Sequence, residues 1–394
     1  MANNFNFYSP TEVIFGKDTH RETGKYIRKY GGSRILILYG SERVFTTGLM
    51  GEITESIKKE GLTFSFLGGI VPNPHLSKVY EGIGLGREMQ ADFLLAVGGG
   101  SVIDTAKAVA YGLAEPEEDV WTLFEHTRTA KKCLPTASVL TIAAAGSETS
   151  MSAVITNEKT KEKRAYDDDL SRPRFAVMNP ELTLSLSDYQ TESGCTDILM
   201  HTMERYFTNG GNMEITDSIA EGLMRTVIAN AVILHGNPQN YDARAEIMWA
   251  GSLAHNNLTG CGNDGGDFAT HMLEHEIGGM FDVTHGAGLA AIWPSYARYV
   301  YRDALPRFVK FAVNVMQIER EHTDEETALK GIETMEKFYH DINMPTNMRE
   351  LGVQPTDEQI HEMAVGAARA CGGSKGSARV LYQDDMEKIY YMAR

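Results

Sequence analysis

The sequence predicts a protein of two domains, an α/β domain with a parallel sheet in residues 1–183 and an all-helical domain in residues 184–394. Two observations lead to this fold class. In the first half, short apolar runs alternate with segments of helical polarity, whereas strand-like alternation nearly disappears after Leu184. The chain has 394 residues and is too long for one ordinary hydrophobic core. The change in pattern falls near Asn179-Pro180, which sets the boundary close to that point.

Strands and helices are expected to alternate along the first half. The clearest strand is residues 34–39, because its continuous apolar run is short and suits a strand buried on both faces. The predicted strands are residues 11–15, 34–39, 63–67, 93–97 and a stretch near 138–140, and the predicted helices are 20–30, 51–60, 76–89 and 102–111. Such alternation predicts a parallel sheet with helices on both faces.

The second half shows helical periodicity almost throughout. The predicted helices there are residues 192–207, 214–234, 242–258, 268–277, 305–315, 325–341 and 357–371. We therefore expect this half to contribute side chains from helices rather than from a sheet.

Composition excludes several classes of protein. With 37 Lys+Arg against 53 Asp+Glu, the formal net charge is -16, so we expect no nucleic-acid partner. No apolar run approaches the roughly 20 residues that span a bilayer, and residues 1–5 lack the pattern of a signal peptide. The four cysteines are far apart and form no C-x-x-C pair, which is typical of reduced thiols. These features predict a cytoplasmic protein without a membrane partner.

A glycine-rich turn follows the predicted strand at residues 93–97. Gly98-Gly99-Gly100-Ser101 leads into a predicted helix, whose first N–H groups could bind a pyrophosphate while the glycines allow close approach. The alternative is a tight turn capped by Ser101, with Asp104 completing a capping box. The G-x-G-x-x-G fingerprint is missing after the first long strand, so an ordinary dinucleotide fold is not expected.

The end of the first long strand bears on the choice between NAD and NADP. An acidic residue at this place would bind both ribose hydroxyls of NAD and repel a 2′-phosphate. Here Gly40 leaves space, Ser41 can donate a hydrogen bond and Arg43 can pair with phosphate, which favours NADP. The adjacent Glu42 could play the opposite part, and a plain turn is a further alternative.

A set of histidines and one aspartate predicts a metal site. Asp197 and His201 are four residues apart and fall on one face of a helix, and His271 and His275 repeat this spacing. We expect Gly278-Gly279 to end the second helix, so that the chain returns and His285 faces the same site. A carboxylate with two or three imidazoles and no thiolate can hold a divalent metal with an open position.

The spacing does not by itself assign a role to His275 or His255. His275 either binds the metal or carries a proton beside it, and spacing alone leaves both roles open. His255 lies on a predicted helix beside two asparagines, and we do not expect it to be a ligand.

Four blocks of the sequence resemble the iron-dependent (group III) alcohol dehydrogenase family, and the match covers nearly the whole chain. The blocks are residues 98–107, residues 144–148, residues 194–201 with Glu204, and residues 271–286. Within the family, Tyr39-Gly40, residues 146–148 and residues 267–271 resemble the NADPH-dependent butanol dehydrogenase and aldehyde reductase branch. The resemblance implies a Rossmann-like sheet domain and a helical domain, the fold shared with dehydroquinate synthase.

The resemblance also implies particular site residues. It implies metal ligands at Asp197, His201, His271 and His285, and it leaves His275 as the non-ligand histidine near the substrate, which we expect to supply the proton directly or through a water. The implied cofactor contacts are Gly40, Ser41, Asn73, Gly98, Gly99, Gly100, Ser101, Asp104, Thr141 and Lys163. Iron(II) is the favoured metal and zinc its competitor, since the ligand set suits both. Family analogy further suggests a homodimer.

The expected activity is hydride transfer between NADP(H), or less favourably NAD(H), and a short primary alcohol or aldehyde such as butanol or butanal. A polyol dehydrogenase related to glycerol dehydrogenase is one alternative, but its pocket should hold several charged groups. Residues 278–281, with Cys195 and Met200, favour a small apolar site instead. A non-catalytic metal- or nucleotide-binding protein is an alternative from another class.

Overall fold

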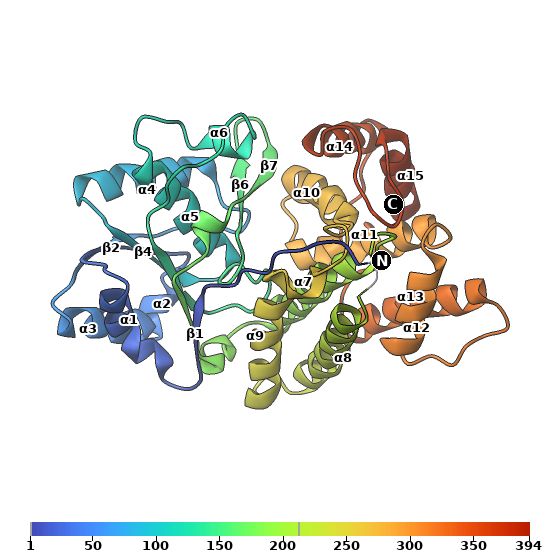
Figure 1. Ribbon diagram of the computed structural model, residues 1–394, viewed down its shortest axis with the longest axis horizontal. Helices are drawn as coiled ribbons and strands as arrows, with labels where there is room; N and C mark the ends of the chain where they lie inside the picture. Colours follow the sequence, from blue (N-terminus) through green and yellow to red (C-terminus); the bar gives the residue numbers. More distant parts are fainter. Residues whose placement is uncertain (1, 212) are drawn as a thin grey trace. The chain divides into compact units, whose positions relative to one another are not determined.

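A six-stranded parallel sheet forms the centre of the first half in the computed structural model, which describes residues 2–211 and 213–394 (Figure 1). Its strands follow the order β1-β8-β5-β4-β2-β3. Their bounds are β1 (Glu12–Phe15), β2 (Arg34–Tyr39), β3 (Thr63–Leu67), β4 (Phe93–Gly98), β5 (Thr136–Leu140) and β8 (Phe175–Met178). The predicted parallel sheet is thereby confirmed.

Helices cover the sheet because its central strands are apolar on both faces. One face of β2 and β4 packs in a core with Ile27 of α1 (Thr23–Lys29) and with Ile53 and Ile57 of α3 (Leu49–Lys59). Alternation along the strands leaves Leu36 and Leu94 for the opposite face. Helix α5 (Gly100–Ala114) contacts β4 and also α4 (Leu76–Glu88).

The order of the strands creates a switch point in the sheet. From β2 the chain moves to β3 on one side, and it then places β4 on the other side of β2. In open parallel sheets, ligands bind at such a point, outside the carboxyl ends of the strands. The carboxyl ends of β2 and β4 therefore mark a candidate ligand site in this part of the chain.

An antiparallel hairpin and several short elements were not predicted from the sequence. The hairpin joins β6 (Ser152–Asn157) to β7 (Glu162–Asp167). The short elements are α2 (Arg43–Thr46), α6 (Trp121–Phe124), η2 (Asp169–Ser171), η3 (Pro180–Thr183) and η4 (Leu258–Gly260), whereas η1 (Thr19–Glu22) is the start of the helix predicted over residues 20–30. Strand β8 was also missed, because four apolar residues in a row show no period that distinguishes a strand from a helix.

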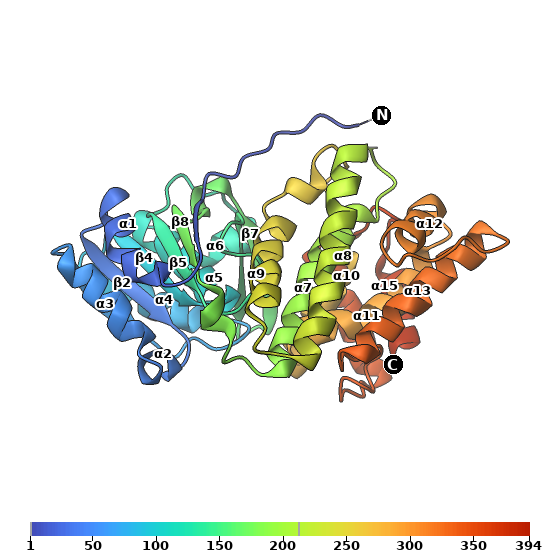
Figure 2. The same ribbon diagram turned by 90° about the horizontal axis from the view of Figure 1, so that it is seen from below.

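The second half is helical, as predicted, and α8, α9 and α11 pack against α7 (Figure 2). Every residue of α7 from Thr191 to Tyr206 is buried, and a capping box of Ser187 and Gln190 fixes its start. The helices are α7 (Asp188–Tyr206), α8 (Glu214–Gly236), α9 (Tyr241–His255), α10 (Ala269–Phe281), α11 (His285–Val300), α12 (Leu305–Asn314), α13 (Asp324–Asp341), α14 (Asp357–Ala370) and α15 (Gln383–Ala393).

Helix α10 contradicts one sequence expectation. It continues through Gly278-Gly279 and ends at Phe281, so the expectation that these glycines end the helix is wrong. The end is set by Asp282, which adopts the left-handed conformation (φ 51°) and whose N–H donates to the carbonyl of Gly278 at 3.0 Å. Aspartate tolerates this conformation, and the resulting bond closes the last turn.

Contacts within the chain define two units, Tyr8–Ser185 and residues 2–7 with Leu186–Arg394. The first residues join the helical unit because the Asn3 N–H donates to the carbonyl of Gly262 at 2.9 Å, whereas they had been expected in the sheet domain. The division after residue 183 itself stays a prediction. Among residues 2–211 and 213–394, no helix is long and apolar enough to cross a bilayer.

Candidate functional site

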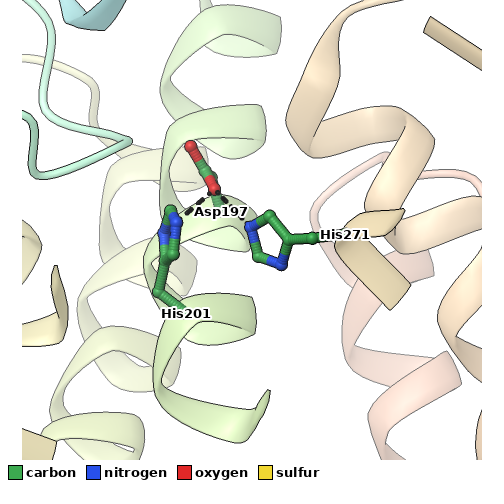
Figure 3. Close-up of side chains that lie close together, drawn as sticks. All are labelled: Asp197, His201 and His271. Carbon is green, nitrogen blue, oxygen red and sulfur yellow. Dashed lines mark ion pairs between the residues drawn. The ribbon is translucent and has the colours of Figure 1, made fainter. Parts of the chain in front are cut away.

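Three buried side chains of the helical unit point toward one another (Figure 3). Asp197 and His201 come from α7 and His271 from α10, and their ligand atoms lie within 4.8 Å of one another. The Oδ1 atom of Asp197 is 3.2 Å from Nδ1 of His201 and 3.7 Å from Nε2 of His271. The Nε2 atom of His285 lies 3.8 Å from the same oxygen. The structure thus brings together all four residues predicted as metal ligands.

The packing of α11 explains how His285 reaches this position. His285 is the first residue of α11, and the next residue, Gly286, lies against the backbone of Ser193 in α7. A Cβ atom at Gly286 would stand 2.0 Å from the carbonyl oxygen of Ser193, so only glycine permits this approach. Close contact between the start of α11 and α7 therefore delivers His285 to Asp197.

Three atoms of this cluster have no hydrogen-bond partner in the described part of the chain. They are Oδ1 of Asp197, Nδ1 of His201 and Nε2 of His271, all buried. Burying such atoms without a partner is costly and uncommon in folded proteins. One divalent cation would satisfy all three at once, and one carboxylate oxygen with imidazole nitrogens is a donor set that suits such an ion. The residues therefore fit a metal ion.

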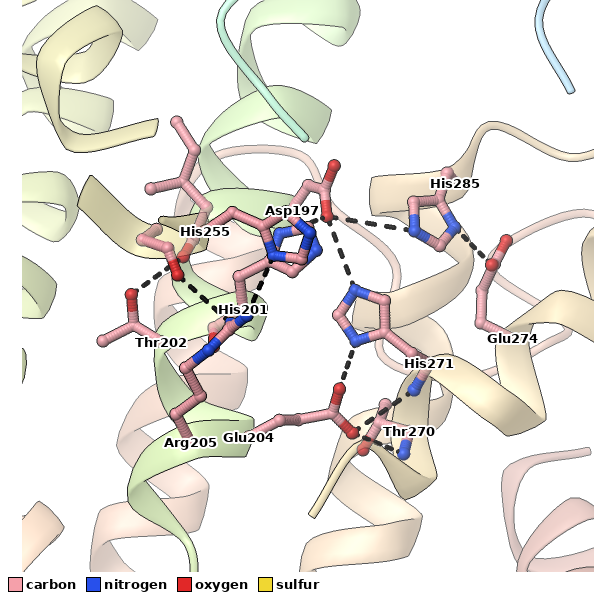
Figure 4. Close-up of polar contacts among 12 residues, drawn as sticks. Asp197, His201, Thr202, Glu204, Arg205, His255, Thr270, His271, Glu274 and His285 are labelled. Atoms are coloured by element: carbon pink, nitrogen blue, oxygen red, sulfur yellow. Dashed lines mark hydrogen bonds and ion pairs between the residues drawn. The ribbon is translucent and has the colours of Figure 1, made fainter. Parts of the chain in front are cut away.

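Two glutamates orient the imidazoles from behind (Figure 4). The Oε2 atom of Glu204 contacts Nδ1 of His271, and the Oε2 atom of Glu274 contacts Nδ1 of His285. Glu204 is fixed in turn by the backbone N–H of Thr270, which donates to its Oε1 at 2.6 Å. A carboxylate behind a ligand histidine fixes the orientation of the ring and raises its basicity.

These two glutamates received no role in the sequence analysis, although a signal was present for each. Glu204 follows Asp197 by seven residues, two turns along the same helical face, and Glu274 follows His271 by three residues. Only the fold shows that both carboxylates reach histidines of the cluster.

The charges of the cluster move the pKa values of two histidines in opposite directions. Burial, followed by the neighbouring His255 and His271, lowers the pKa of His201 well below its usual value. Burial also disfavours the protonated form of His271, but Glu204 and Asp197 outweigh it and raise the pKa of His271 to about 9. A metal ion would replace the proton of His271, because only a deprotonated nitrogen can bind it.

His275 lies next to this cluster but outside the buried trio. Its ring is 5.8 Å from that of His285 and 6.4 Å from that of His271, between centroids. It is half-buried and shares a second potential ligand group with Glu274 and His285. The assignment of His275 to proton transfer stays a prediction.

His255 lies closer to the cluster than the sequence indicated. Its ring is 4.1 Å from that of His201 between centroids, and its Nδ1 accepts a hydrogen bond from Nη2 of Arg205 at 3.1 Å. His255 is the last residue of α9, so its sequence neighbours give no regular spacing to the other histidines. This proximity depends on helix packing and leaves no signal in the sequence.

Several of the predicted nucleotide contacts of the sheet unit lie at or just after the carboxyl ends of its strands. Gly40-Ser41 follows β2 and Gly98 ends β4, on the two sides of the switch point. Thr141 follows β5, and its N–H donates to the carbonyl of Gly98 at 3.0 Å. Asn73 lies in the chain after β3. The next residue, Pro74, accepts a hydrogen bond at its carbonyl from the N–H of Thr156 at 2.8 Å. Thr156 pairs with Lys163 in the β6–β7 hairpin, so this hairpin lies beside residues 73–74.

The start of α5 bears on the alternative interpretation of the glycine turn, the capping box. The helix begins at Gly100 with Gly99 as its N-cap, and no side chain caps it, so the capping box of Ser101 and Asp104 is wrong. Ser101 instead lies within the first turn, where its carbonyl accepts from Thr105 Oγ1 at 2.8 Å. Uncapped N–H groups at the start of a long helix suit an anionic ligand.

Close packing explains why glycines occupy this turn. A Cβ atom at Gly99 would lie 3.0 Å from the side chain of Ile142, and one at Gly100 would lie 3.1 Å from Cβ of Ala145. Asp104, farther along α5, is buried and bonded within the chain, since it accepts from Ser147 Oγ at 2.6 Å and from the N–H of Val154 at 3.0 Å. Its predicted cofactor contact stays a prediction.

The end of β2 differs in two ways from the interpretation that favoured NADP. The hydroxyl of Tyr39 donates to Oε1 of Glu42 at 2.9 Å and holds this carboxylate beside the strand end. The guanidinium of Arg43 donates to the carbonyl of Ser185 at 2.7 Å rather than standing free for a phosphate. Both observations weaken the argument for a 2′-phosphate at this place.

Comparison with known proteins identifies the family. Residues 10–180 match the model of iron-containing alcohol dehydrogenase, and residues 191–393 match the C-terminal model of the Fe-containing alcohol dehydrogenase family. The chain therefore belongs to the iron-containing alcohol dehydrogenase family, as the sequence motifs indicated.

Relatives with names and structures cover almost all of the chain. It is 36% identical to NADH-dependent butanol dehydrogenase A of Clostridium acetobutylicum over 98% of both chains. It is 34% identical to the NADPH-dependent aldehyde reductase YqhD of Escherichia coli over 89% of this chain and 90% of that protein. The crystal structure of NADH-dependent butanol dehydrogenase A from Thermotoga maritima superimposes with a TM-score of 0.95 at 35% identity, covering 100% of this chain and 99% of that one. This likeness confirms the predicted fold.

Proposed function

We propose that the protein is an alcohol dehydrogenase and aldehyde reductase that transfers hydride reversibly between a nicotinamide nucleotide and a short primary alcohol or aldehyde. Family membership and the names of its relatives support this activity. The observation that carries the proposal is the buried cluster of Asp197, His201 and His271, whose inward-facing atoms lack hydrogen-bond partners in the described residues. Together with His285, these residues would hold one divalent metal ion.

When bound, the ion would act as a Lewis acid that polarises the oxygen of the substrate. The protein fixes the geometry of the site through Glu204 and Glu274, which face Nδ1 of His271 and His285. In the neutral imidazoles this arrangement leaves the lone pair on Nε2, directed toward Asp197. Because the cluster lies on packed helices, its side chains need little rearrangement when they bind the ion.

We assign proton transfer to His275. It is one helical turn from His271, half-buried and beside His285, so it can reach a proton near the metal without being one of the buried trio. In the reductive direction, its imidazole would donate the proton that completes the alcohol.

The ligand chemistry suits iron(II), zinc or related ions, and we favour iron(II) because of the family to which the chain belongs. Zinc binds such a set more tightly than iron(II) in general, so availability during expression decides which ion is found. Metal analysis of protein purified without chelators would identify it, with one ion per chain expected.

For the nucleotide we propose NADP(H), on the basis of Gly40 and Ser41 at the end of β2. NAD(H) is a second candidate with an observation in its favour, since Tyr39 holds the carboxylate of Glu42 where it could bind ribose hydroxyls. The relatives include proteins named for each nucleotide. Comparison of kcat/KM for NADPH and NADH with one aldehyde would decide the preference.

One assay separates the proposed activity from its alternatives. Protein loaded with iron(II) is assayed in two mixtures. The reductive mixture contains NADPH and butanal, and the oxidative mixture contains NADP and glycerol. Consumption of NADPH with butanal supports the proposal, and a clear preference for glycerol would favour a polyol dehydrogenase. Bound metal without turnover of any substrate would indicate a binding protein instead. A homodimer, which we also propose from the family, is tested by sedimentation of the same sample.

A further inference from the structure

The segment between β5 and β6 buries an unusual run of polar residues. Ser147, Glu148, Thr149 and Ser150 are all buried, yet they belong to no helix or strand. Buried backbone that is not in regular secondary structure needs other hydrogen-bond partners. In this segment, two buried cations supply several of them.

The first cation is Lys107, whose side chain is 0% exposed. Its Nζ donates to the carbonyl oxygens of Ser147 at 2.8 Å, Ser150 at 3.0 Å and Ser152 at 2.7 Å, and it lies 2.9 Å from Oγ of Ser147. A single ammonium group therefore organises three carbonyls of one short segment. Such charge-assisted bonds are stronger than neutral ones.

Two further residues hold the same stretch of chain. Asp104, one turn before Lys107 on α5, accepts from Oγ of Ser147 and from the N–H of Val154. The buried Arg172 donates from Nη1 to the carbonyl of Thr149 at 2.7 Å. The segment is thereby fastened to α5 at one side and to the residue after η2 at the other.

This fastening bears on the glycine turn. Just before the buried segment, Ile142 lies against Gly99 and Ala145 lies against Gly100. A Cβ atom added to Gly99 would be 3.0 Å from Ile142, and one added to Gly100 would be 3.1 Å from Ala145. Residues 142–145, which pack against the start of α5, are thus directly followed by the segment that Lys107 holds. A shift of that segment would move residues 142–145.

We propose that Lys107 is a positioning residue of the nucleotide site, whose ammonium group holds residues 147–152 so that residues 142–145 stay packed against the glycine turn. The inference rests on the proposed function, because it takes the glycine turn as the place where the nucleotide phosphates bind. It assigns a function to a buried lysine whose ammonium group bonds to residues of the protein itself.

Protonation provides a way to test this role. Burial lowers the pKa of Lys107 to about 8, although Asp104 and Glu148 favour the charged form. The titratable and charged groups that face Lys107 from the packed elements are Asp104 on α5, Glu148 in the segment, Asp167 on β7, Arg172 after η2 and Cys133 before β5. Above about pH 8 the amine has two donor hydrogens for these acceptors in place of three. Nucleotide binding should therefore weaken as pH rises through this value.

The test measures the dissociation constant of NADPH, and of NADH in parallel, for the full-length metal-loaded protein between pH 7 and pH 9.5. Fluorescence of the reduced nucleotide gives the constant without any turnover. For Lys107→Met we expect a roughly 10-fold or larger increase in the constant at pH 7 and no further change with pH. Ser147→Ala, which removes one contact of the ammonium and one of Asp104, should give a smaller increase and keep the pH dependence.

Arg128→Met is the matched control. Arg128 also holds a loop to α5, but at the opposite end of that helix, through Glu115 Oε2 at 2.6 Å and Thr122 Oγ1 at 2.7 Å. The Arg128→Met variant should have a lower melting temperature and an unchanged dissociation constant for the nucleotide. It therefore separates a loss of stability from a loss of the positioning of residues 147–152.

The outcomes are distinct. Weaker binding and a lost pH dependence in Lys107→Met, with normal binding in Arg128→Met, support the inference. Wild-type affinity in a folded Lys107→Met protein would overturn it, and so would a wild-type pH dependence in that variant, in both cases with the proposed function intact. If the wild-type protein binds neither nucleotide, the proposed function fails and the inference fails with it.

Discussion

The predicted metal site of the helical unit is formed by side chains, whereas the glycine turn after β4 in the sheet unit offers mainly backbone groups. At the cluster, side chains on α7, α10 and α11 converge, and their function depends on which residue type stands at each position. At the glycine turn, the proposed nucleotide site consists of backbone N–H groups and of Gly99 and Gly100, which carry no side chains. A side-chain site should therefore lose its function completely when one residue is changed, whereas a backbone site should change by degrees.

The largest effect is expected for the ligands themselves. Asp197→Ala or His271→Ala should remove the metal and lower kcat/KM by roughly 1000-fold or more, because Lewis-acid stabilisation contributes several kcal/mol to such reactions. Metal content and turnover are measured on the same preparation. Asp188→Ala, an exposed position at the start of α7, serves as the control and should keep both. One ion per chain in the Asp197 variant would show that the aspartate is not a ligand.

His275→Ala should reduce kcat by roughly 100-fold while the metal stays bound, since general acid catalysis contributes a factor of this order. A solvent isotope effect that changes in the variant would connect the loss to proton transfer. Loss of metal would instead make His275 a ligand, contrary to its position outside the buried trio.

Glu204→Gln should weaken metal binding by roughly 10- to 100-fold, because the carboxylate behind His271 supports the basicity of that ligand. Titration with a competing chelator measures the affinity. Glu274→Gln is expected to act in the same way through His285. If neither change alters the affinity, the glutamates have only a packing role.

The smallest effect is expected at Gly40, the residue that follows β2. Gly40→Asp should lower kcat/KM with NADPH more than with NADH, by roughly 10-fold, because a carboxylate there repels a 2′-phosphate. A Cβ atom at Gly40 would lie 3.0 Å from the carbonyl of Ile70, so Gly40→Ala measures the steric part alone. An unchanged ratio of the two nucleotides in Gly40→Asp would remove this position from cofactor choice.

The parts of the fold and of the candidate site that the sequence could predict are those with a regular spacing along the chain. Asp197 and His201, and His271 and His275, were visible because helical spacing makes residues four apart neighbours. The strands at residues 34–39 and 63–67 have the predicted bounds, because the first is a continuous short apolar run and the second alternates apolar and polar residues. Sequence motifs also led to the correct family.

What escaped prediction depends on tertiary packing. Helix α11 is buried on nearly all sides and contains Pro294, a residue that usually interrupts a helix, and α10 continues past two glycines because the left-handed Asp282 sets its end. The hydrogen bond from Tyr39 to Glu42 and the ring of His255 beside His201 involve side-chain positions that no spacing rule gives. The fold class was therefore easier to predict than the surroundings of the site.

The central claim is that Asp197, His201, His271 and His285 together bind one divalent ion. An anomalous difference map from crystals of the iron- or zinc-loaded protein tests it most directly. The account predicts a single peak within roughly 2.0–2.3 Å of one ligand atom from each of the four residues. A peak held instead by Glu274, His275 and His285, with Asp197 and His201 unbound, would contradict it.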